Sequence, residues 1–321
     1  MQRTTDSPFT MTLDKVPDRL RGGVVAIGNF DGVHRGHQAV LGAALAAGRP
    51  TAALTFEPHP RAFFSGRPLF RLTPPAVKAH VMAALGLDAM VVGTFDAAFA
   101  ALSADAFIEE IIVRRFGAKA VVVGHDFNYG AKRSGGVATL QDAGRRNGFS
   151  VEVVDEFTDA RGAISSSRIR KNLAAADLDG AAALLGYRYR VEAPIIHGEK
   201  RGRTMNYPTA NQSLGPDNEL AHGIYAVRIE IDGVWRDGAA SYGRRPTFDN
   251  GAPLLETFVF DFEGDLYGKT LPVTFVKYLR PEIAFTGMEA LIEQMDADSR
   301  AARAALAEVQ PISALDRTLN F

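Results

Sequence analysis

The sequence contains no cysteine, which excludes disulfide bonds, thiolate metal sites and cysteine nucleophiles. Its formal net charge is only −1, so the charge balance predicts no nucleic-acid partner and no anionic membrane. It also lacks a run of about 18 apolar residues that could span a membrane, and residues 1–16 lack the apolar core of a signal peptide. We therefore expect a soluble cytoplasmic protein, either a monomer or a homo-oligomer.

The first half of the sequence alternates continuous apolar runs with helix-forming stretches. Such alternation predicts an α/β domain with a parallel sheet covered on both faces, whose ligand sits at the carboxyl ends of the strands. The predicted strands are 24–27, 52–56, 89–93, 120–124 and 150–154. The predicted helices are 38–47, 74–85, 104–116 and 139–147.

The second half has strands that follow one another without helices between them, which predicts a small antiparallel β-barrel. These strands are 189–196, 224–231, 234–241, 255–262 and 271–279, preceded by a predicted helix over 173–185. A C-terminal helix follows, in which Met288, Leu291, Ile292 and Met295 form a stripe predicted to face the core. The expected domains are a poorly ordered leader over 1–20, then 21–186 and 187–321.

The loop after the first predicted strand carries the strongest chemical signal. It contains Gly28 and then His34-Arg35-Gly36-His37 at the start of a helix. Backbone N–H groups at a helix start favour a phosphate, and a neutral imidazole can donate to a phosphate oxygen as negative charge develops. The pattern therefore predicts chemistry at a nucleotide phosphate. Two alternatives stay open: histidine ligation of a metal, and a structural glycine loop with solvated histidines.

A second signal is the run of three serines at 165–167, followed by Arg168 and Arg170. The hydroxyls could cap a helix start, which is a purely structural role. They would also suit ATP phosphates, with an arginine as a forked donor. Since the two arginines cannot share one helical face, we choose Arg170, which lies three and four residues after Ser167 and Ser166.

These segments together resemble the adenylyltransferase half of the prokaryotic bifunctional riboflavin kinase/FAD synthetase family. The matching segments are 28–37, 56–60, 124–130 and 164–170, in the family's order. The resemblance implies a nucleotidyltransferase-type, Rossmann-like fold in which the phosphate of FMN attacks the α-phosphorus of ATP and expels pyrophosphate, assisted by Mg²⁺. It implies His34 and His37 at the ATP phosphates and Ser166, Ser167 and Arg170 on the pyrophosphate side. The remaining residues implied for ATP and FMN are Gly28, Phe30, Asp31, Gly32, His59 and Asp126.

Two features of the second half indicate phosphoryl transfer. Residues 198–203 form a basic, glycine-containing loop, and Thr209 and Asn211 shortly after it offer the hard oxygen atoms that Mg²⁺ prefers. Strand alternation places Glu256 on one face with Phe258 and Phe260, a face expected to point inward, where a carboxylate would serve as a general base. The alternatives are a solvated hairpin with a proline turn and a glutamate at the barrel rim.

The second half resembles the riboflavin kinase half of the same family. The matching segments are 198–211, 243–248, 254–256, 261–268 and 279–282. The resemblance implies that Glu256 activates the riboflavin 5′-hydroxyl towards the γ-phosphate of ATP, and that Thr209 and Asn211 bind Mg²⁺. Further residues implied for ATP and flavin are Gly198, Lys200, Gly202, Arg203, Pro208 and Arg280.

The resemblance covers residues 24–303 and predicts an enzyme that converts riboflavin to FMN and FMN to FAD. The sequence departs from the family at Met205-Asn206, where Leu-Gly is usual. One alternative is therefore a protein in which only the FMN adenylyltransferase half is active. A non-enzymatic alternative is a flavin-binding protein without turnover. For the first domain alone, another acceptor such as a phosphopantetheine or a nicotinate nucleotide also stays open.

Overall fold

The structure is a computed structural model that describes residues 9–196, 209–244 and 253–321. Contacts between Cα atoms divide the chain into two compact units, one spanning Gln2–Ser166 and the other Ser167–Phe321. This division lies upstream of the domain boundary that the sequence predicts at residues 186 and 187. That boundary stays a prediction.

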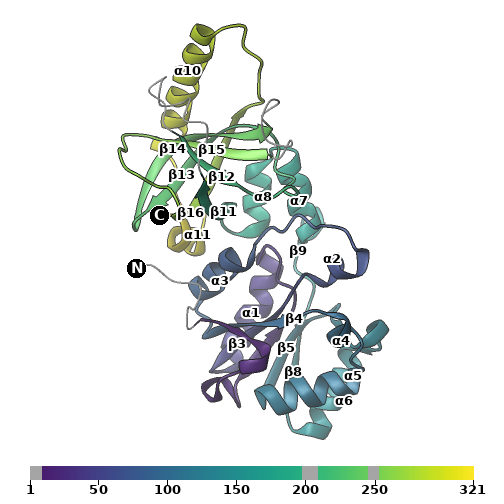
Figure 1. Cartoon of the computed structure of the whole chain (residues 1–321). Coiled ribbons are helices and arrows are strands. Elements are labelled where there is room, and N and C mark those ends of the chain that lie inside the picture. The colour runs from purple at the N-terminus through teal and green to yellow at the C-terminus, as the bar shows by residue number, and fades with distance from the viewer. Residues whose placement is uncertain (1–8, 197–208, 245–252) are drawn as a thin grey trace. The chain divides into compact units, whose positions relative to one another are not determined.

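The first unit is built on a six-stranded sheet in the order β1-β4-β3-β2-β5-β8, in which every neighbouring pair is parallel (Figure 1). The strands are β1 (Thr10–Thr12), β2 (Val24–Ile27), β3 (Thr51–Glu57), β4 (Ala89–Thr94), β5 (Ala120–Gly124) and β8 (Ser150–Val154). The central strands are rich in Val, Ile, Leu and Ala because helices cover both faces of the sheet. The predicted α/β parallel-sheet fold is confirmed.

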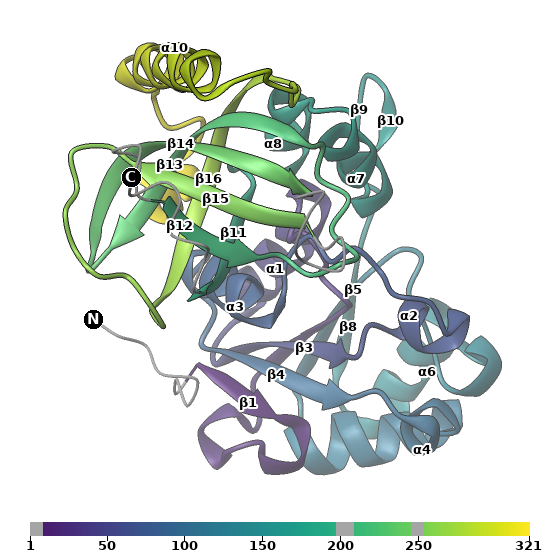
Figure 2. The same ribbon diagram turned by 45° about the horizontal axis from the view of Figure 1, so that its top comes forward.

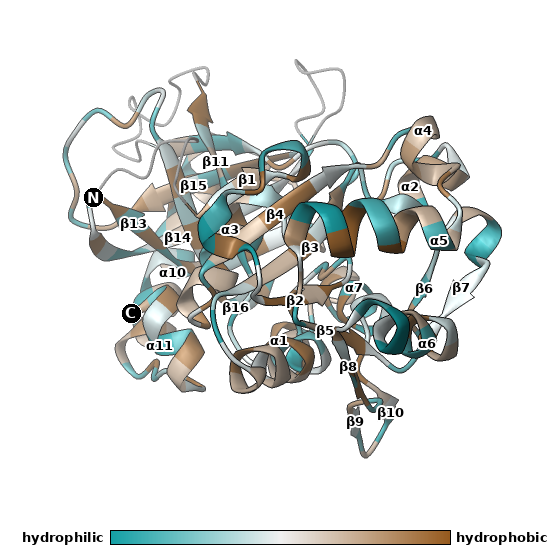
Figure 3. Cartoon of the chain, turned by 90° about the horizontal axis from the view of Figure 1, so that it is seen from below, coloured by the Kyte–Doolittle hydropathy of each residue, from teal (hydrophilic) through white to brown (hydrophobic). Residues whose placement is uncertain are grey.

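The covering elements of this unit are α1 (Arg35–Ala47), α2 (Pro60–Ser65), α3 (Pro75–Ala84), α4 (Ala97–Ala100), α5 (Ala104–Phe107), the π-helical segment η3 (Ile108–Phe116) and α6 (Val137–Asn147). The four predicted helices of this unit are present, and the short helices α2 and α4 are additional to them. In Figure 3 the helix formed by α5 and η3 is banded, because Ile111 and Ile112 are buried in the core while Glu109 and Arg114 are exposed. Two short hairpins complete the unit: β6 (Asn128–Tyr129) with β7 (Gly135–Gly136), and β9 (Thr158–Asp159) with β10 (Gly162–Ala163).

Part of the predicted leader is ordered structure. Residues 10–12 form strand β1, which pairs in parallel with β4, and two 3-10 turns follow at η1 (Leu13–Lys15) and η2 (Asp18–Leu20). Leu13 and Leu20 are buried in the core of the sheet. The expectation of a poorly ordered leader is therefore wrong for residues 10–20, because these two leucines cover an edge of the sheet.

The predicted helix over 173–185 is also wrong as a single element. The chain forms α7 (Ser166–Ala174) and α8 (Leu178–Leu185) instead. Ala176 between them has a positive φ of 59°, which no helix interior accepts, and the Asp177 side chain caps α8 by accepting the Gly180 backbone N–H.

The second unit contains a closed barrel of six strands in the order β11-β12-β15-β14-β13-β16. All of its pairs are antiparallel, so the predicted barrel is confirmed. The strands are β11 (Arg190–Ile196), β12 (Thr209–Ser213), β13 (Gly223–Ile231), β14 (Val234–Arg244), β15 (Pro253–Val259) and β16 (Thr270–Arg280). Two helices follow, α10 (Met288–Ala307) and α11 (Ala314–Asn320).

Helix α10 lies across the outside of the barrel and contacts β13, β14 and β16 (Figure 2). Its Ala302 and Leu306 pack against Phe260 just after β15, with Phe258 beside it. The predicted stripe on α10 therefore continues to the buried C-terminal part of the helix, whereas Met288 at its start is 60% exposed. The prediction that Met288 is a core residue is wrong.

Because Phe258 and Phe260 pack against α10, the face of β15 that they share with Glu256 is the outer face of the barrel. The barrel interior holds the alternate residues Leu255, Thr257 and Val259. The alternation along this strand is predicted correctly, but the prediction that the face with Glu256 points inward is wrong. A strand pattern distinguishes two faces without indicating which of them a helix covers.

Candidate active sites

The first unit contains a cavity of about 1230 Å³ where four parallel strands end. Its walls come from residues 27–31 after β2, 56–64 after β3, 95–102 after β4 and 124–133 after β5. Ligands of open α/β sheets bind at this edge, because loops from neighbouring strands converge there. Seven of the residues implied for ATP and FMN line the cavity: Gly28, Phe30, Asp31, His37, His59, Asp126 and Ser166.

His34 and His37 are held against each other at the start of α1. The His34 side chain is the N-cap of the helix: its Nδ1 accepts the His37 backbone N–H at 3.3 Å. The two rings stack with centroids 3.6 Å apart, and the edge of Phe30 meets the His37 ring at 5.4 Å. Since His34 Nδ1 accepts, its proton is assigned to Nε2. The His37 Nδ1 atom is buried and has no hydrogen-bond partner among the described residues.

Both imidazoles are neutral at physiological pH. Burial lowers the pKa of His34 to about 4. Burial holds the pKa of His37 well below its usual value, and the charge of a protonated His34, of Lys78 and of a protonated His59 would lower it further. Neutral rings still donate a hydrogen bond, and they add no full charge to a buried site.

The loop that leads to these histidines has an unusual backbone. Phe30 and Val33 have positive φ values of 49° and 36°, a region that side chains with a Cβ rarely adopt. Thr73 fixes the loop through two hydrogen bonds: its Oγ1 accepts the Gly32 N–H at 2.8 Å, and its own N–H donates to Asp31 Oδ1 at 3.1 Å. The Ser166 hydroxyl donates to the Asp31 carbonyl at 2.8 Å. The loop conformation is thus determined by tertiary contacts.

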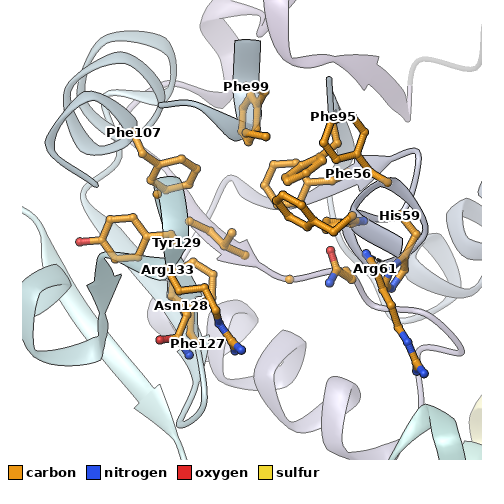
Figure 4. Close-up of a pocket in the computed structure, with 18 of the residues that line it drawn as sticks. Phe56, His59, Arg61, Phe95, Phe99, Phe107, Phe127, Asn128, Tyr129 and Arg133 are labelled. Atoms are coloured by element: carbon orange, nitrogen blue, oxygen red, sulfur yellow. Dashed lines mark hydrogen bonds between the residues drawn. The ribbon is translucent and has the colours of Figure 1, made fainter. Parts of the chain in front are cut away.

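Much of the cavity wall is aromatic, a feature that the sequence analysis missed. Figure 4 shows Phe56 and Phe95 on one side and Phe127 and Tyr129 on the other, with Phe99 and Phe107 between them. Contacts at ring-centroid distances of 5.2 to 6.2 Å connect them through Phe99 and Phe107. Phe63 and Phe64 of α2 extend this wall, and Phe64 is 70% exposed. Such a wall suits a large planar ligand. The paired Phe63-Phe64 in a surface helix is the one local signal for it.

Positively charged side chains line the same cavity. Arg61 and Arg133 are among its lining residues (Figure 4), and Lys132 precedes Arg133 on the loop after β5. His59 caps α2 by accepting the Arg61 backbone N–H at 3.1 Å. The cavity therefore combines aromatic surface with donors for anionic oxygen atoms, which is what a phosphorylated aromatic ligand needs.

Four of the implied adenylyltransferase residues are not among those that line the cavity. His34 is the N-cap of α1, with its ring stacked on that of His37. Gly32 is buried in the loop, with a φ of 87°. Ser167 and Arg170 lie on α7, in the other unit. Their assignment to ATP phosphates stays a prediction.

In the second unit, the polar residues predicted from the sequence share one row on the outside of the barrel. Asn211 of β12 pairs directly with Glu256 of β15, which pairs with Ser241 of β14. Directly opposite residues of antiparallel strands point to the same face. Thr209, two residues before Asn211, therefore lies on this face too. Asn211 is only 4% exposed, and its Nδ2 donates to the Thr209 carbonyl at 3.2 Å.

The row continues through Ile224 of β13 to Arg280 of β16. Arg280 forms an ion pair with Asp298 on α10: its Nε and Nη2 donate to the two carboxylate oxygens at 2.8 and 2.5 Å. Glu282 follows two residues later, and burial together with the charge of Glu256 raises its pKa. The sequence analysis singled out neither Asp298 nor Glu282 as a site residue.

Several predicted kinase residues lie outside the described residues: Gly198, Lys200, Gly202, Arg203 and Pro208. The departure at Met205-Asn206 lies there as well. Among the residues that the structure describes, no three His, Asp or Glu side chains form a metal-binding group, and no helix has the length and apolarity to cross a membrane. Thr209 and Asn211, on one face beside Glu256, offer a set of oxygen donors of the kind that fits Mg²⁺.

Comparison with known proteins accounts for both units. The FAD synthetase family matches residues 16–168, and the riboflavin kinase family matches residues 185–306. A bifunctional riboflavin kinase/FMN adenylyltransferase of Listeria monocytogenes is 39% identical over 295 residues, covering 89% of this chain and 93% of the relative. The enzymes of the same description from Haemophilus influenzae and Escherichia coli K12 are 40% and 37% identical, over 89% and 88% of this chain and 94% and 92% of their own lengths.

A solved structure from Streptococcus pneumoniae, described as a macrolide-efflux protein, superposes with a TM-score of 0.80 at 29% identity, covering 92% of this chain and 99% of that one. The two family matches follow each other along the chain in the same order as the parallel-sheet unit and the barrel. With relatives 37 to 40% identical over nearly nine tenths of its length, the chain belongs to the family of bifunctional riboflavin kinases/FMN adenylyltransferases.

Proposed function

We propose that the barrel phosphorylates riboflavin to FMN and that the parallel-sheet unit adenylylates FMN to FAD. The observation that carries the proposal is the cavity of the first unit, where an aromatic wall and the buried His37 meet at the end of one parallel sheet. A flavin ring and a nucleotide phosphate require these two surfaces side by side. The substrates are small molecules, ATP and flavins, and we place the reactions in the cytoplasm.

In the adenylyl transfer, an oxygen of the FMN phosphate attacks the α-phosphorus of ATP. The bond from the α-phosphorus to the oxygen that bridges to the β-phosphorus breaks, and pyrophosphate leaves. No protein nucleophile is needed, so positioning and charge stabilisation carry the catalysis. The roles of the chain are then to stack the flavin on the phenylalanines, to receive phosphate at the start of α1, and to donate from His34 and His37 to the oxygens that gain charge. Ser166, Ser167 and Arg170 are proposed for the pyrophosphate.

In the kinase reaction, the 5′-hydroxyl oxygen of riboflavin attacks the γ-phosphorus of ATP, and ADP leaves with the bridging oxygen. Glu256 takes the hydroxyl proton as the new bond forms. Asn211 directly opposite Glu256, with Thr209 beside it, would hold Mg²⁺ near that carboxylate, and the ion would neutralise phosphate charge. Arg280, fixed by Asp298, is placed to meet the flavin or its new phosphate.

The test is a chromatographic separation of flavins after the protein has been incubated with riboflavin, ATP and Mg²⁺. We expect FMN first and FAD second. Glu256→Gln should abolish FMN formation, by about 10²-fold or more, while FAD still forms from added FMN. His37→Ala should abolish FAD formation from FMN and leave FMN formation from riboflavin intact. The matched control for Glu256→Gln is Glu263→Gln, at an exposed position in the same unit as Glu256.

Each contrary outcome has a definite meaning. FAD from FMN without FMN from riboflavin in the parent protein would restrict the activity to the first unit. Flavin binding without any product would replace the enzyme by a binding protein. Equal losses of both activities in both variants would contradict the division of labour between the two units.

A further inference from the structure

Helix α3 carries a buried lysine that the reaction described above does not use. Lys78 is 2% exposed, on a face where Val77, Val81 and Met82 are also buried. Its ammonium group donates to the carbonyl of Asn29 at 2.9 Å and to Thr55 Oγ1 at 3.0 Å. Asn29 lies in the loop that runs from the end of β2 to His34 at the start of α1.

An ammonium group is costly to bury, so its surroundings must offset the loss of hydration. Glu57 Oε1 lies 3.8 Å from Lys78 Nζ, and the Glu57 carboxylate is also paired with Arg71. Asp31 is a buried carboxylate whose negative charge raises the pKa of Lys78, whereas the positive charge of Arg71 lowers it. Burial nevertheless lowers the pKa of Lys78 to about 8. A charge kept here at such a cost indicates a use beyond packing.

The Asn29 carbonyl is held from two directions. The Thr55 hydroxyl donates to it at 3.0 Å and at the same time accepts from Lys78. This closed triangle lies immediately before Phe30, the first left-handed residue of the loop. Such a conformation costs of order 1 kcal/mol or more at a residue with a Cβ, and it persists only where surrounding contacts determine it. Without the triangle, the loop can relax and move the histidine at its end.

The charge of Lys78 also reaches the ring at the end of the loop. The positive charge of the Lys78 ammonium disfavours a proton on His37. Lys78 thus acts on His37 in two ways, through the backbone that leads to it and through the electric field.

We propose that Lys78 is a positioning residue for adenylyl transfer, which pins the Asn29 carbonyl and so holds the loop to His37 in its reactive shape. The inference rests on the proposed role of the cavity in FAD formation. Lys78 itself touches neither substrate in this account.

The experiment compares Lys78→Met, which keeps the length and apolar stem, with Lys119→Met, an exposed lysine of the same unit. The kcat and KM for FAD formation from FMN are measured, with riboflavin phosphorylation as the internal control. Two further readouts distinguish positioning from general destabilisation: amide hydrogen exchange of residues 28–34, and the NMR chemical shifts of the His37 side chain near neutral pH.

For Lys78→Met we expect kcat for FAD formation to fall at least tenfold, with KM for FMN within about twofold and kinase activity unchanged. Exchange in residues 28–34 should be faster than in the parent, and the chemical shifts of the His37 side chain should change. Lys119→Met should resemble the parent in every measurement. A kcat within twofold of the parent, or unchanged exchange in residues 28–34, would overturn the proposal.

If Lys78→Met does not fold, Thr55→Val provides the answer, because it removes the bridging hydroxyl and keeps the lysine. We then expect a three- to tenfold lower kcat with faster exchange in the loop, and a parental kcat would again overturn the inference. His37→Ala, measured in parallel, distinguishes failure of the positioning role from failure of the proposed function. Should His37→Ala retain FAD formation, the proposed function of the cavity itself fails; should only Lys78→Met and Thr55→Val retain it, the positioning role alone fails.

Discussion

His34 Nδ1 accepts the backbone N–H of His37, and the rings of the same two residues stack at 3.6 Å. One histidine therefore caps the helix and supports the ring of the other. A proton on His34 Nδ1 would abolish the cap and would place a positive charge against the second ring. The pair is consequently built for the neutral state, and this has a measurable dependence on pH.

We predict that the first unit loses stability as the pH falls from 6.5 towards 4. The pKa of His34 is about 4 in the folded protein and near 6.5 in the unfolded chain, so below pH 6.5 the unfolded chain binds the additional proton. The stability is fully present above pH 6.5, and roughly 3 kcal/mol is lost below pH 4 through this residue alone. Replacing it by an uncharged cap, His34→Asn, should reduce the loss.

The probes for this measurement follow from the sequence. The only tryptophan, Trp235, lies on β14 of the barrel, so its fluorescence reports the second unit. Acid unfolding of the first unit should appear in far-UV circular dichroism at a higher pH than any change in Trp235 emission. Identical acid transitions of the parent and His34→Asn would contradict the assignment.

The ion pair between Arg280 and Asp298 should contribute strongly to barrel stability. Asp298 is buried, and its removal leaves a largely buried arginine without its carboxylate. We expect Asp298→Ala to lower the free energy of unfolding by about 3 kcal/mol, measured by denaturant titration of Trp235 fluorescence. The control is Asp261→Asn, which removes an exposed ion pair with Arg303 and should lower the free energy of unfolding far less.

Phe64 offers a test of the aromatic wall that is separate from folding. Because it is 70% exposed, Phe64→Ala should leave thermal stability nearly unchanged. If the ring packs on the flavin, KM for FMN in the adenylyl transfer should rise several-fold, while riboflavin phosphorylation stays at the parental rate. Ile312→Ala, at an exposed apolar residue of the other unit, is the comparison. A parental KM for FMN would remove Phe64 from the proposed flavin contact.

Asn211 tests the metal assignment in the kinase half. Asn211→Ala should raise the Mg²⁺ concentration needed for half-maximal FMN formation by about tenfold or more, since one hard oxygen donor is lost. The Mg²⁺ dependence of FAD formation should not change. Ser213→Ala, at an exposed position of the same strand, serves as the control. An equal change in the Mg²⁺ dependence of both reactions would place the ion elsewhere.

The order of elements could be predicted well from the sequence, because apolar runs and turn residues are local signals. The five predicted parallel strands agree with the structure to within one residue at either end. Strand β1 was missed since Thr10–Thr12 is a strand only by virtue of its pairing with β4. Strand β12 was missed because its residues Thr209–Ser213 are polar and follow a proline, which favours a turn.

The sites were predicted less completely, for a different physical reason. The histidine pair and the alternation of Glu256 with Phe258 and Phe260 each belong to one short segment, so their spacing is visible in the sequence. The aromatic wall and Lys78 are not, because their partners come from segments more than 20 residues away. A lysine within a helix of alanines and valines predicts a solvent-facing charge, and only the tertiary fold shows that Asn29 and Thr55 receive it.

The position of Glu256 and Asn211 on the outer face of a closed barrel has a consequence for protein engineering. The interior residues Leu255, Thr257 and Val259 stabilise the barrel from the side opposite to the reacting groups. The interior can accordingly be repacked for heat resistance, or drift in evolution, without altering the chemistry on its surface. Stability and catalysis are thereby encoded by alternate residues of the same strand.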